Sequence, residues 1–238
     1  MESSLKQSLA VIPARGGSQR FPGKNKAILG GKPLICHSIE LAVKHFTTVI
    51  FSSDCKELKN IAYNLNLNNL VIQDQPTASN TSQVLECIRQ IYEERENDGF
   101  NEIWMLLPTC PLRKDYDISQ CKRLLRNSNK FVVSITDVDF PPSLSLDIRS
   151  GGTITSTCPS RPWENKNHRS QNHRICYRPN GAIYGADWVS FRDNNFNFYS
   201  DNSTAGYYMD KSRCVDIDYP IDLKIAELIL NENNNNSQ

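Results

Sequence analysis

The fold of this chain is decided by Val11-Ile-Pro-Ala-Arg-Gly-Gly-Ser-Gln-Arg-Phe-Pro-Gly-Lys-Asn25. The apolar run 9–12 predicts the first strand of a buried parallel sheet. Glycines in the loop that follows allow a tight turn and bring backbone N–H groups close to an anion. Three cations, Arg15, Arg20 and Lys24, match the charge of a polyphosphate. A strand, glycines and cations in this order predict phosphate binding, and an ordinary βα turn with solvated cations is the alternative.

The loop belongs to neither of the two common nucleotide-binding patterns. It lacks the Gly-Lys-Ser/Thr ending of a P-loop. It also lacks the Gly-x-Gly-x-x-Gly spacing of a dinucleotide fold. The sequence therefore indicates a different class of nucleotide-binding protein.

Composition narrows the possible functions further. A chain of 238 residues is expected to form one α/β domain, with or without a subdomain, and its net charge of +1 argues against a nucleic-acid surface. The N-terminus is too polar for a signal peptide, and no apolar run approaches the roughly 20 residues that cross a bilayer. Eight scattered cysteines without a Cys-x-x-Cys pair favour a reduced, cytoplasmic protein without structural zinc.

Helix and strand patterns alternate along most of the chain. The expected helices are 33–46, 56–65, 81–96, 116–125 and 221–230, and the expected strands are 9–12, 48–52, 70–72, 103–107, 131–136, 178–184 and 214–218. This βαβα rhythm predicts a mostly parallel sheet with helices on both faces.

Two segments depart from the rhythm. The segment 139–174 is rich in Pro, Ser, Asn, Gly and Arg, and so long an irregular insert is uncommon unless it is functional. It is expected to be an active-site lid or an arm that packs on another subunit. The Asn-rich end, 231–238, is expected to be a disordered tail.

Asp216 and Asp218 are the candidate metal ligands. They flank Ile217 in an expected strand, so both carboxylates project from one face with Cβ atoms about 7 Å apart. Hard oxygen ligands suit Mg²⁺, which proteins usually hold with one or two carboxylates and substrate phosphates. The alternative is that these aspartates cap the helix that follows. The predicted phosphate loop makes a metal-bridged nucleotide the better explanation.

Two further polar groups lie at ends of expected strands. Arg178, Asn180 and Tyr184 form one of them, although Asn180 and Gly181 could equally make a turn. The motif 108–113 follows a strand at the edge where open α/β sheets bind ligands. No basic partner is evident for Cys110 of this motif, so it is interpreted as a packing residue.

Together these residues resemble the acylneuraminate cytidylyltransferases, which activate sialic-acid-like nonulosonic acids. The matching motifs, in order, are Ile12-Pro-Ala-Arg-Gly-Gly-Ser-Gln-Arg-Phe-Pro-Gly-Lys-Asn25, Pro108-Thr-Cys-Pro-Leu-Arg113, Arg178-Pro-Asn-Gly-Ala-Ile-Tyr184 and Asp216-Ile-Asp218. The resemblance spans about residues 8 to 230. It implies a Rossmann-like nucleotide-diphospho-sugar transferase fold and an extended arm that swaps across a homodimer.

The resemblance also implies a role for each candidate residue. CTP would be bound by Arg15, Gly16, Gly17, Ser18, Arg20, Lys24 and Asn25. Asp216 and Asp218 would hold Mg²⁺ and, with Arg15 and Lys24, form the catalytic set. The acidic nine-carbon sugar would contact Asn180, Tyr184 and Arg178, and Arg169 of the arm would reach the partner's substrate.

The expected reaction is cytidylyl transfer from CTP to the anomeric hydroxyl of a nonulosonic acid, with release of pyrophosphate. Four residues depart from the family pattern: Gln19, Gln73, Asn80 and Leu107. The alternatives are therefore a 3-deoxy-manno-octulosonate cytidylyltransferase and a catalytically weak nucleotide-binding homologue. The sequence does not identify the acceptor acid.

Overall fold

The computed structural model of the chain describes residues 7–75, 83–127 and 129–235. Within these residues one seven-stranded sheet has the order β11-β7-β10-β6-β1-β4-β5. The strands are β1 (Ser8–Pro13), β4 (Thr48–Ser53), β5 (Leu70–Asp74), β6 (Glu102–Met105), β7 (Phe131–Asp137), β10 (Tyr177–Asp187) and β11 (Thr204–Tyr208). Pairing is parallel except that β10 runs antiparallel to both of its neighbours. The mostly parallel sheet predicted from the sequence is confirmed.

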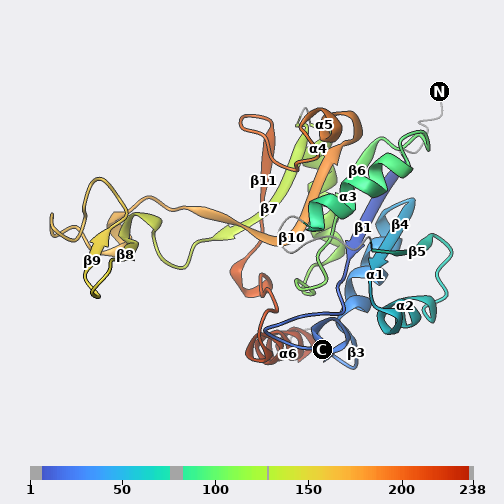
Figure 1. Cartoon of the computed structure of the whole chain (residues 1–238), viewed down its shortest axis with the longest axis horizontal. Helices are drawn as coiled ribbons and strands as arrows, with labels where there is room; N and C mark the ends of the chain where they lie inside the picture. The colour runs from blue at the N-terminus through green and yellow to red at the C-terminus, as the bar shows by residue number, and fades with distance from the viewer. Residues whose placement is uncertain (1–6, 76–82, 128, 236–238) are drawn as a thin grey trace.

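Helices cover both faces of this sheet (Figure 1). One apolar core packs α1 (Leu34–His45), α2 (Lys56–Tyr63) and α4 (Asp115–Arg126) against the sheet. A second core packs α3 (Gln83–Glu94) and α5 (Trp188–Asp193) against the opposite face. Because β1 and β6 are adjacent and parallel, the loops that follow them meet at the same edge of the sheet.

The C-terminal region differs from the sequence prediction. Segment 214–218 is not a strand, because it forms no ladder; it follows a 3₁₀ turn at Lys211–Arg213 and runs as an extended loop. Helix α6 spans Pro220–Asn235 and so includes 231–235 of the segment expected to be a tail, and 236–238 lie outside the described residues. Ala226 of α6 packs with Leu29 and Ile217 in a small core that holds this helix in place.

Short elements were also missed. Two short antiparallel pairs are present, and each of their strands has two or three residues. They are β2 (Ile28–Leu29) with β3 (Lys32–Pro33), and β8 (Leu146–Ile148) with β9 (Ile154–Ser156). So few residues give no measurable periodicity. No helix in the described part of the chain has the length and apolar character to span a membrane.

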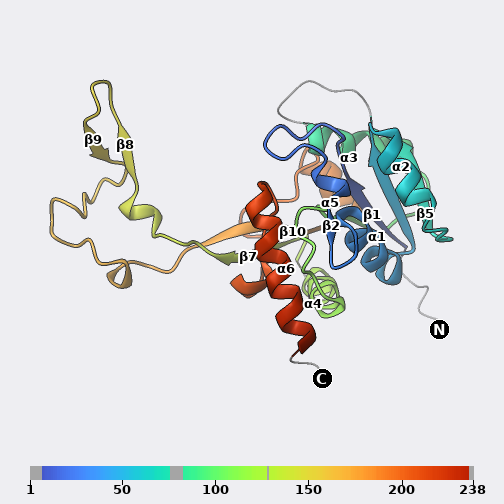
Figure 2. The same ribbon diagram turned by 90° about the horizontal axis from the view of Figure 1, so that it is seen from below.

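The irregular insert forms an arm between β7 and β10. Residues 138–176 extend away from the body of the protein in both views and end in the β8–β9 hairpin (Figures 1 and 2). Ile148 pairs directly with Ile154, and these side chains are 79 % and 64 % exposed. An isolated two-stranded hairpin is only marginally stable in water. Its exposed apolar side chains therefore form a surface that a partner could cover.

Strand β10 contains a bulge that shapes the edge of the site. Its register against β7 shifts between Pro179 and Tyr184, and Gly181 adopts φ +79°. The buried Ser134 hydroxyl donates to Asn180 Oδ1 at 2.6 Å and accepts the Ile183 N–H at 2.8 Å. These contacts satisfy backbone and side-chain groups that the interrupted ladder leaves unpaired.

We expect Ser134→Ala to lower the free energy of unfolding by about 1–3 kcal/mol, because it leaves the buried Ile183 N–H without its acceptor. Urea denaturation measures this difference. Ser119→Ala, on the exposed face of α4, is the matched control and should change stability by no more than about 0.5 kcal/mol. Equal stabilities for the two variants would contradict this account of the bulge.

Candidate functional site

The glycine-rich loop after β1 is held against the rest of the protein at its start. The Gly16 N–H donates to Asp54 Oδ1 at 2.7 Å. A Cβ added at Gly16 would lie 2.7 Å from Cys55 Cβ, so only glycine allows this approach. At the other end of the loop, Asn25 Nδ2 donates to the Arg15 carbonyl at 2.8 Å. The loop is therefore closed on itself before any ligand binds.

An ion-pair cluster joins this loop to the end of the chain. Asp218 accepts from Arg20 at 2.7 Å and from Lys24 Nζ at 3.0 Å, although Lys24 and Asp218 are 194 residues apart in sequence. Lys24 is buried, and the Asp218 carboxylate supplies the charge that compensates it. The two charged groups that the sequence predicts to converge are thus in direct contact.

The cluster lines a cavity of about 700 Å³. The loop side of the cavity includes Arg15, Gly17, Ser18, Gln19, Arg20, Lys24 and Asn25. The opposite side includes Leu107, Pro108 and Thr109, from the motif that follows β6, together with Asp218. A polar cavity of this size with three cations on one wall suits a polyphosphate.

Asp216 and Asp218 flank a residue that ties this segment to the motif after β6. Ile217 between them is fully buried, and its N–H donates to the Thr109 carbonyl at 2.8 Å. Asp216 Oδ1 lies 3.8 Å from Cys110 Sγ, next to the bulge at Gly181. Asp218 thus lines the polar cavity and Asp216 lies beside the bulge, and the strand that was predicted for them is not formed.

The two carboxylates fit a hard divalent cation that is shared with a ligand. Within the described residues, no group of three or more His, Cys, Asp or Glu side chains could hold a metal by itself. Mg²⁺ is commonly bound by one or two carboxylates, with water and phosphate oxygens completing its shell. Asp216 and Asp218, beside a cavity suited to phosphate, provide two carboxylates for such a site.

Buried charges fix the segments that carry these side chains. Asp117 is fully buried and accepts from Arg213 at 2.5 Å and from the Tyr207 hydroxyl at 2.8 Å. Arg113 is also buried and donates to the carbonyls of Leu107 at 2.9 Å and Ala182 at 2.6 Å. Arg213 therefore anchors the approach to Asp216, and Arg113 ties the wall of the cavity to the bulge.

The Cys110 thiol is not a nucleophile in this structure. Burial, together with the nearby Asp216 carboxylate, raises the pKa of Cys110 to about 12. The thiol is therefore protonated at neutral pH, and it donates to the Asn180 carbonyl at 3.1 Å. The interpretation of Cys110 as a packing residue is confirmed.

The residues predicted to contact a sugar are not all in one place. Asn180 is 1 % exposed, and its amide is bonded to Ser134, Ala182 N–H and Cys214 Sγ, so it supports the bulge beneath the site. Arg178 is exposed at the root of the arm and donates to the Pro179 carbonyl. Arg169 belongs to the arm, where it precedes the 3₁₀ turn Ser170–Asn172. Substrate contacts by these three residues stay predictions.

Tyr184 lines a separate, apolar cavity of about 350 Å³. Its other walls include Val84, Met105, Leu107 and Phe198. Val84 and Leu107 also line the polar cavity, so the two cavities are neighbours along the same edge of the sheet. Burial raises the pKa of Tyr184 to about 12, which keeps its phenol neutral.

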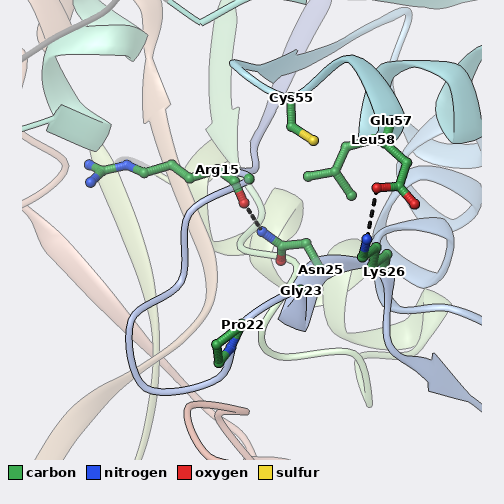
Figure 3. Close-up of a pocket in the computed structure, with 9 residues that line it drawn as sticks. Arg15, Pro22, Gly23, Asn25, Lys26, Cys55, Glu57 and Leu58 are labelled. Atoms are coloured by element: carbon green, nitrogen blue, oxygen red, sulfur yellow. Dashed lines mark hydrogen bonds and ion pairs between the residues drawn. The ribbon is translucent and has the colours of Figure 1, made fainter.

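A third cavity, of about 380 Å³, lies on the far side of the glycine-rich loop. Figure 3 shows Lys26 directed towards Glu57 across it, and Lys26 Nζ lies 2.7 Å from Glu57 Oε2. The Arg15 side chain extends away from Cys55 and Glu57. Lys26 is thus paired with Glu57, whereas Lys24, two residues earlier, is paired with Asp218.

Sequence reasoning missed the buried charges Arg113, Asp117 and Arg213 as positioning residues. Of the four departures from the family pattern, Gln19 lines the polar cavity and Leu107 lines both neighbouring cavities. Gln73 on β5 donates to Glu94 Oε2 at 2.6 Å. Asn80 lies outside the described residues.

The chain is similar to known proteins over most of its length. A family model described as cytidylyltransferase matches residues 9–144. The chain is 31 % identical over 229 residues to a CMP-N,N'-diacetyllegionaminic acid synthase of Legionella pneumophila, covering 94 % of this chain and 97 % of that protein. It is 25 % identical over 236 residues to a pseudaminic acid cytidylyltransferase of Campylobacter jejuni, covering 95 % of this chain and 97 % of that protein.

Solved structures with a similar fold have little sequence identity to this chain. One is a CMP:2-keto-3-deoxy-manno-octonic acid synthetase in complex with CTP, with a TM-score of 0.66, 16 % identity and coverage of 95 % of this chain and 100 % of that chain. Another is a 4-diphosphocytidyl-2C-methyl-D-erythritol synthase of Anaerococcus prevotii, with a TM-score of 0.66, 12 % identity and coverage of 95 % and 99 %. These likenesses establish the Rossmann-like nucleotidyltransferase fold.

We expect Lys24→Met to weaken binding of inorganic triphosphate about tenfold or more, because a hydrogen bond to a charged group is worth about 1.5–3 kcal/mol. Isothermal titration calorimetry measures the dissociation constant. Lys26→Met removes a similar charge two residues away, but from a side chain that is paired with Glu57. It should leave the affinity within about twofold, and equal losses in the two variants would contradict the assignment of Lys24.

Proposed function

The chain belongs to the cytidylyltransferase family, and we propose that it transfers a cytidylyl group from CTP to a nonulosonic acid. The products are the CMP-sugar and pyrophosphate. The observation that carries the proposal is the contact of Asp218 with Arg20 and Lys24 at the wall of the polar cavity. This contact joins a cationic phosphate loop to a carboxylate pair suited to a divalent cation.

The loop residues bind and orient the triphosphate. Arg15, Arg20 and Lys24 draw charge from the β- and γ-phosphates, which makes pyrophosphate a better leaving group. Backbone N–H groups of Gly17 and Ser18 lie in the same loop and line the cavity, whereas the Gly16 N–H is bonded to Asp54. The acid's anomeric hydroxyl gives its proton to a carboxylate of the site or to water and attacks the α-phosphate in line. A new O–P bond forms, and the bond from the α-phosphorus to the bridging oxygen breaks, so that pyrophosphate leaves. Positioning and charge neutralisation account for most of the acceleration in such transfers.

Asp216 and Asp218 would hold the Mg²⁺ ion, which supplies charge stabilisation to the phosphate oxygens when it is bound. In the absence of ligand, Arg20 and Lys24 compensate the charge of Asp218. On binding of the triphosphate, Arg20 and Lys24 would exchange the Asp218 carboxylate for phosphate oxygens and leave that carboxylate free for the cation. The loop cations are thereby placed beside the leaving group before the reaction begins.

The arm completes the proposed assembly as a homodimer. It extends from the body, and its hairpin exposes an apolar pair, Ile148 and Ile154. An arm with this shape can reach a second copy and bring Arg169 towards the acidic substrate bound there. All eight cysteines are free thiols, which agrees with a reducing, cytoplasmic location.

Neither alternative has a specific observation in its favour. The octulosonate enzyme is similar in fold at 16 % identity, which carries no information on the acceptor. A non-catalytic nucleotide-binding homologue would not need the carboxylate pair that Ile217 holds in place beside the loop. The proposal therefore retains a nonulosonic acid as the acceptor.

We expect the protein to release pyrophosphate when it is given CTP, Mg²⁺ and one of a panel of sialic, legionaminic and pseudaminic acids. Asp216→Asn and Asp218→Asn should each lower kcat by about 10²–10³-fold, because charge stabilisation in the transition state is lost. A coupled pyrophosphate assay measures the rate.

The control is Asp193→Asn, an exposed carboxylate at the end of α5, which should keep the wild-type rate. Near-native turnover in Asp218→Asn with Mg²⁺ present would refute the metal role. Binding of CTP without pyrophosphate release for any acid would instead favour the non-catalytic homologue.

We expect the wild-type chain to have the mass of a dimer in size-exclusion chromatography with light scattering. The double variant Ile148→Asp, Ile154→Asp should shift it to a monomer, since two charges would be buried without partners at the interface. Ser150→Asp, in the turn of the same hairpin, should remain a dimer. A wild-type monomer at micromolar concentration would contradict the role given to the arm.

A further inference from the structure

The cavity on the far side of the glycine-rich loop has no function in the proposed cytidylyl transfer. Its volume is about 380 Å³, which is in the range of small-ligand pockets, and its walls come from the loop and from the start of α2. It shares only Arg15 and Asn25 with the walls of the polar cavity. A molecule bound here would therefore contact the loop from behind.

One wall of this cavity carries a thiol that solvent can reach. Cys55 is half-buried, whereas five of the eight cysteines are buried. It lies so close to the loop that a Cβ added at Gly16 would be 3.2 Å from its Sγ. The other two half-buried thiols, Cys158 and Cys176, belong to the arm. Among the described residues, Cys55 alone combines an accessible thiol with one of the three cavities described above.

A second feature of the same wall indicates what the cavity would bind. Asn25 is 7 % exposed, and its Oδ1 atom has no hydrogen-bond partner in the described part of the chain, since Nδ2 is the group that donates to the Arg15 carbonyl. Figure 3 shows this side chain reaching into the space that the loop encloses between Arg15 and Gly23. A buried acceptor without a partner costs free energy, and the N–H group of a ligand would satisfy it.

The start of α2 provides a place for an anionic group beside the thiol. Cys55 is the N-cap residue of α2, and its side chain makes no capping hydrogen bond with the described residues. The first N–H groups of a helix have no partners within the helix and favour negative charge. Lys26, paired with Glu57, adds a cation to the same wall. The cavity therefore combines a thiol with sites for an amide N–H and for a carboxylate.

We propose that Cys55 is a site of reversible thiolation by the disulfide of a small peptide-like thiol. The Cys55 thiol loses its proton, and its sulfur attacks one sulfur of the disulfide. A mixed disulfide forms, and the other half leaves as a thiolate that takes up a proton. Cys55 is thereby oxidised and the leaving half is reduced. The attached half occupies the cavity, with an amide N–H on Asn25 Oδ1 and a carboxylate at the start of α2.

The adduct weakens triphosphate binding from behind the loop. It fills the space against Gly16 and Asn25, whose hydrogen bonds to Asp54 and to the Arg15 carbonyl close the loop. Displacement of either residue moves the loop cations away from the positions that suit a triphosphate. Thiolation and triphosphate binding are thus coupled, and each opposes the other. This inference goes beyond cytidylyl transfer, because it assigns a modification site that controls access of the nucleotide.

The first experiment treats the wild-type protein with oxidised glutathione and, separately, with hydroxyethyl disulfide, which has neither an amide nor a carboxylate. Peptide mapping by mass spectrometry gives the rate of thiolation at each cysteine. We expect the ratio of the two rates to be about fivefold higher at Cys55 than at Cys158, the effect of one neutral hydrogen bond. Cys158 is a suitable reference, because hydrogen bonding to Ser160 lowers the pKa of its thiol.

The second experiment measures the affinity for inorganic triphosphate by isothermal titration calorimetry before and after treatment with oxidised glutathione. We expect thiolation to weaken binding about tenfold, within the usual range of coupling between two sites, and dithiothreitol to restore it. Cys55→Ser should bind within about twofold of the untreated wild type, with or without treatment. Cys158→Ser is the matched control and should lose affinity on treatment as the wild type does.

Equal rate ratios at the two cysteines would overturn the inference, and so would an adduct at Cys55 that leaves the triphosphate affinity unchanged. A loss of affinity in treated Cys55→Ser would also overturn it, because another thiol would then be responsible. Neither experiment uses an acceptor acid. Failure of cytidylyl transfer with every acid of the panel would therefore refute the proposed function and leave this inference standing.

Discussion

The structure depends on one electrostatic constraint: a buried lysine near the start of the chain needs a carboxylate from its end. Lys24 is 9 % exposed, and Asp218 is the anion that compensates it, at 3.0 Å. A buried ammonium without a partner would be strongly destabilising, so the loop and the C-terminal segment have to meet. Because they meet at the carboxyl edge of a parallel sheet, the constraint places the cationic loop and the Asp218 carboxylate around one cavity.

Other buried charges make this arrangement rigid. Arg113 is enclosed by protein, and burial lowers its pKa to about 10, yet it remains charged at neutral pH and bonds carbonyls from two different segments. The buried Asp117 carboxylate holds Arg213 in place through an ion pair. These groups contact no ligand, but they fix Leu107, the bulge in β10 and the approach to Asp216. A site that must hold several phosphate oxygens in line needs such support, because small displacements reduce transfer rates strongly.

The sequence predicted the parts of this arrangement that depend on local pattern. The apolar run in β1, the glycines and cations of its loop, and the alternation at Asp216, Ile217 and Asp218 are visible without coordinates. The expected strand at 214–218 was wrong because an exposed–buried–exposed pattern requires only extended backbone, and not a neighbouring strand. Partners 69 to 96 residues apart, such as Arg113 with Ala182 and Asp117 with Arg213, depend on the tertiary fold and leave no local signal.

The most direct test of the account is a crystal structure of the protein with CTP and Mn²⁺ in place of Mg²⁺. The account predicts the triphosphate in the polar cavity, with Lys24 and Arg15 on its oxygens. It also predicts an anomalous peak at coordinating distance from Asp216 or Asp218, about 2.0–2.2 Å for a small divalent ion. A triphosphate bound elsewhere, or a metal ion away from both carboxylates, would contradict it.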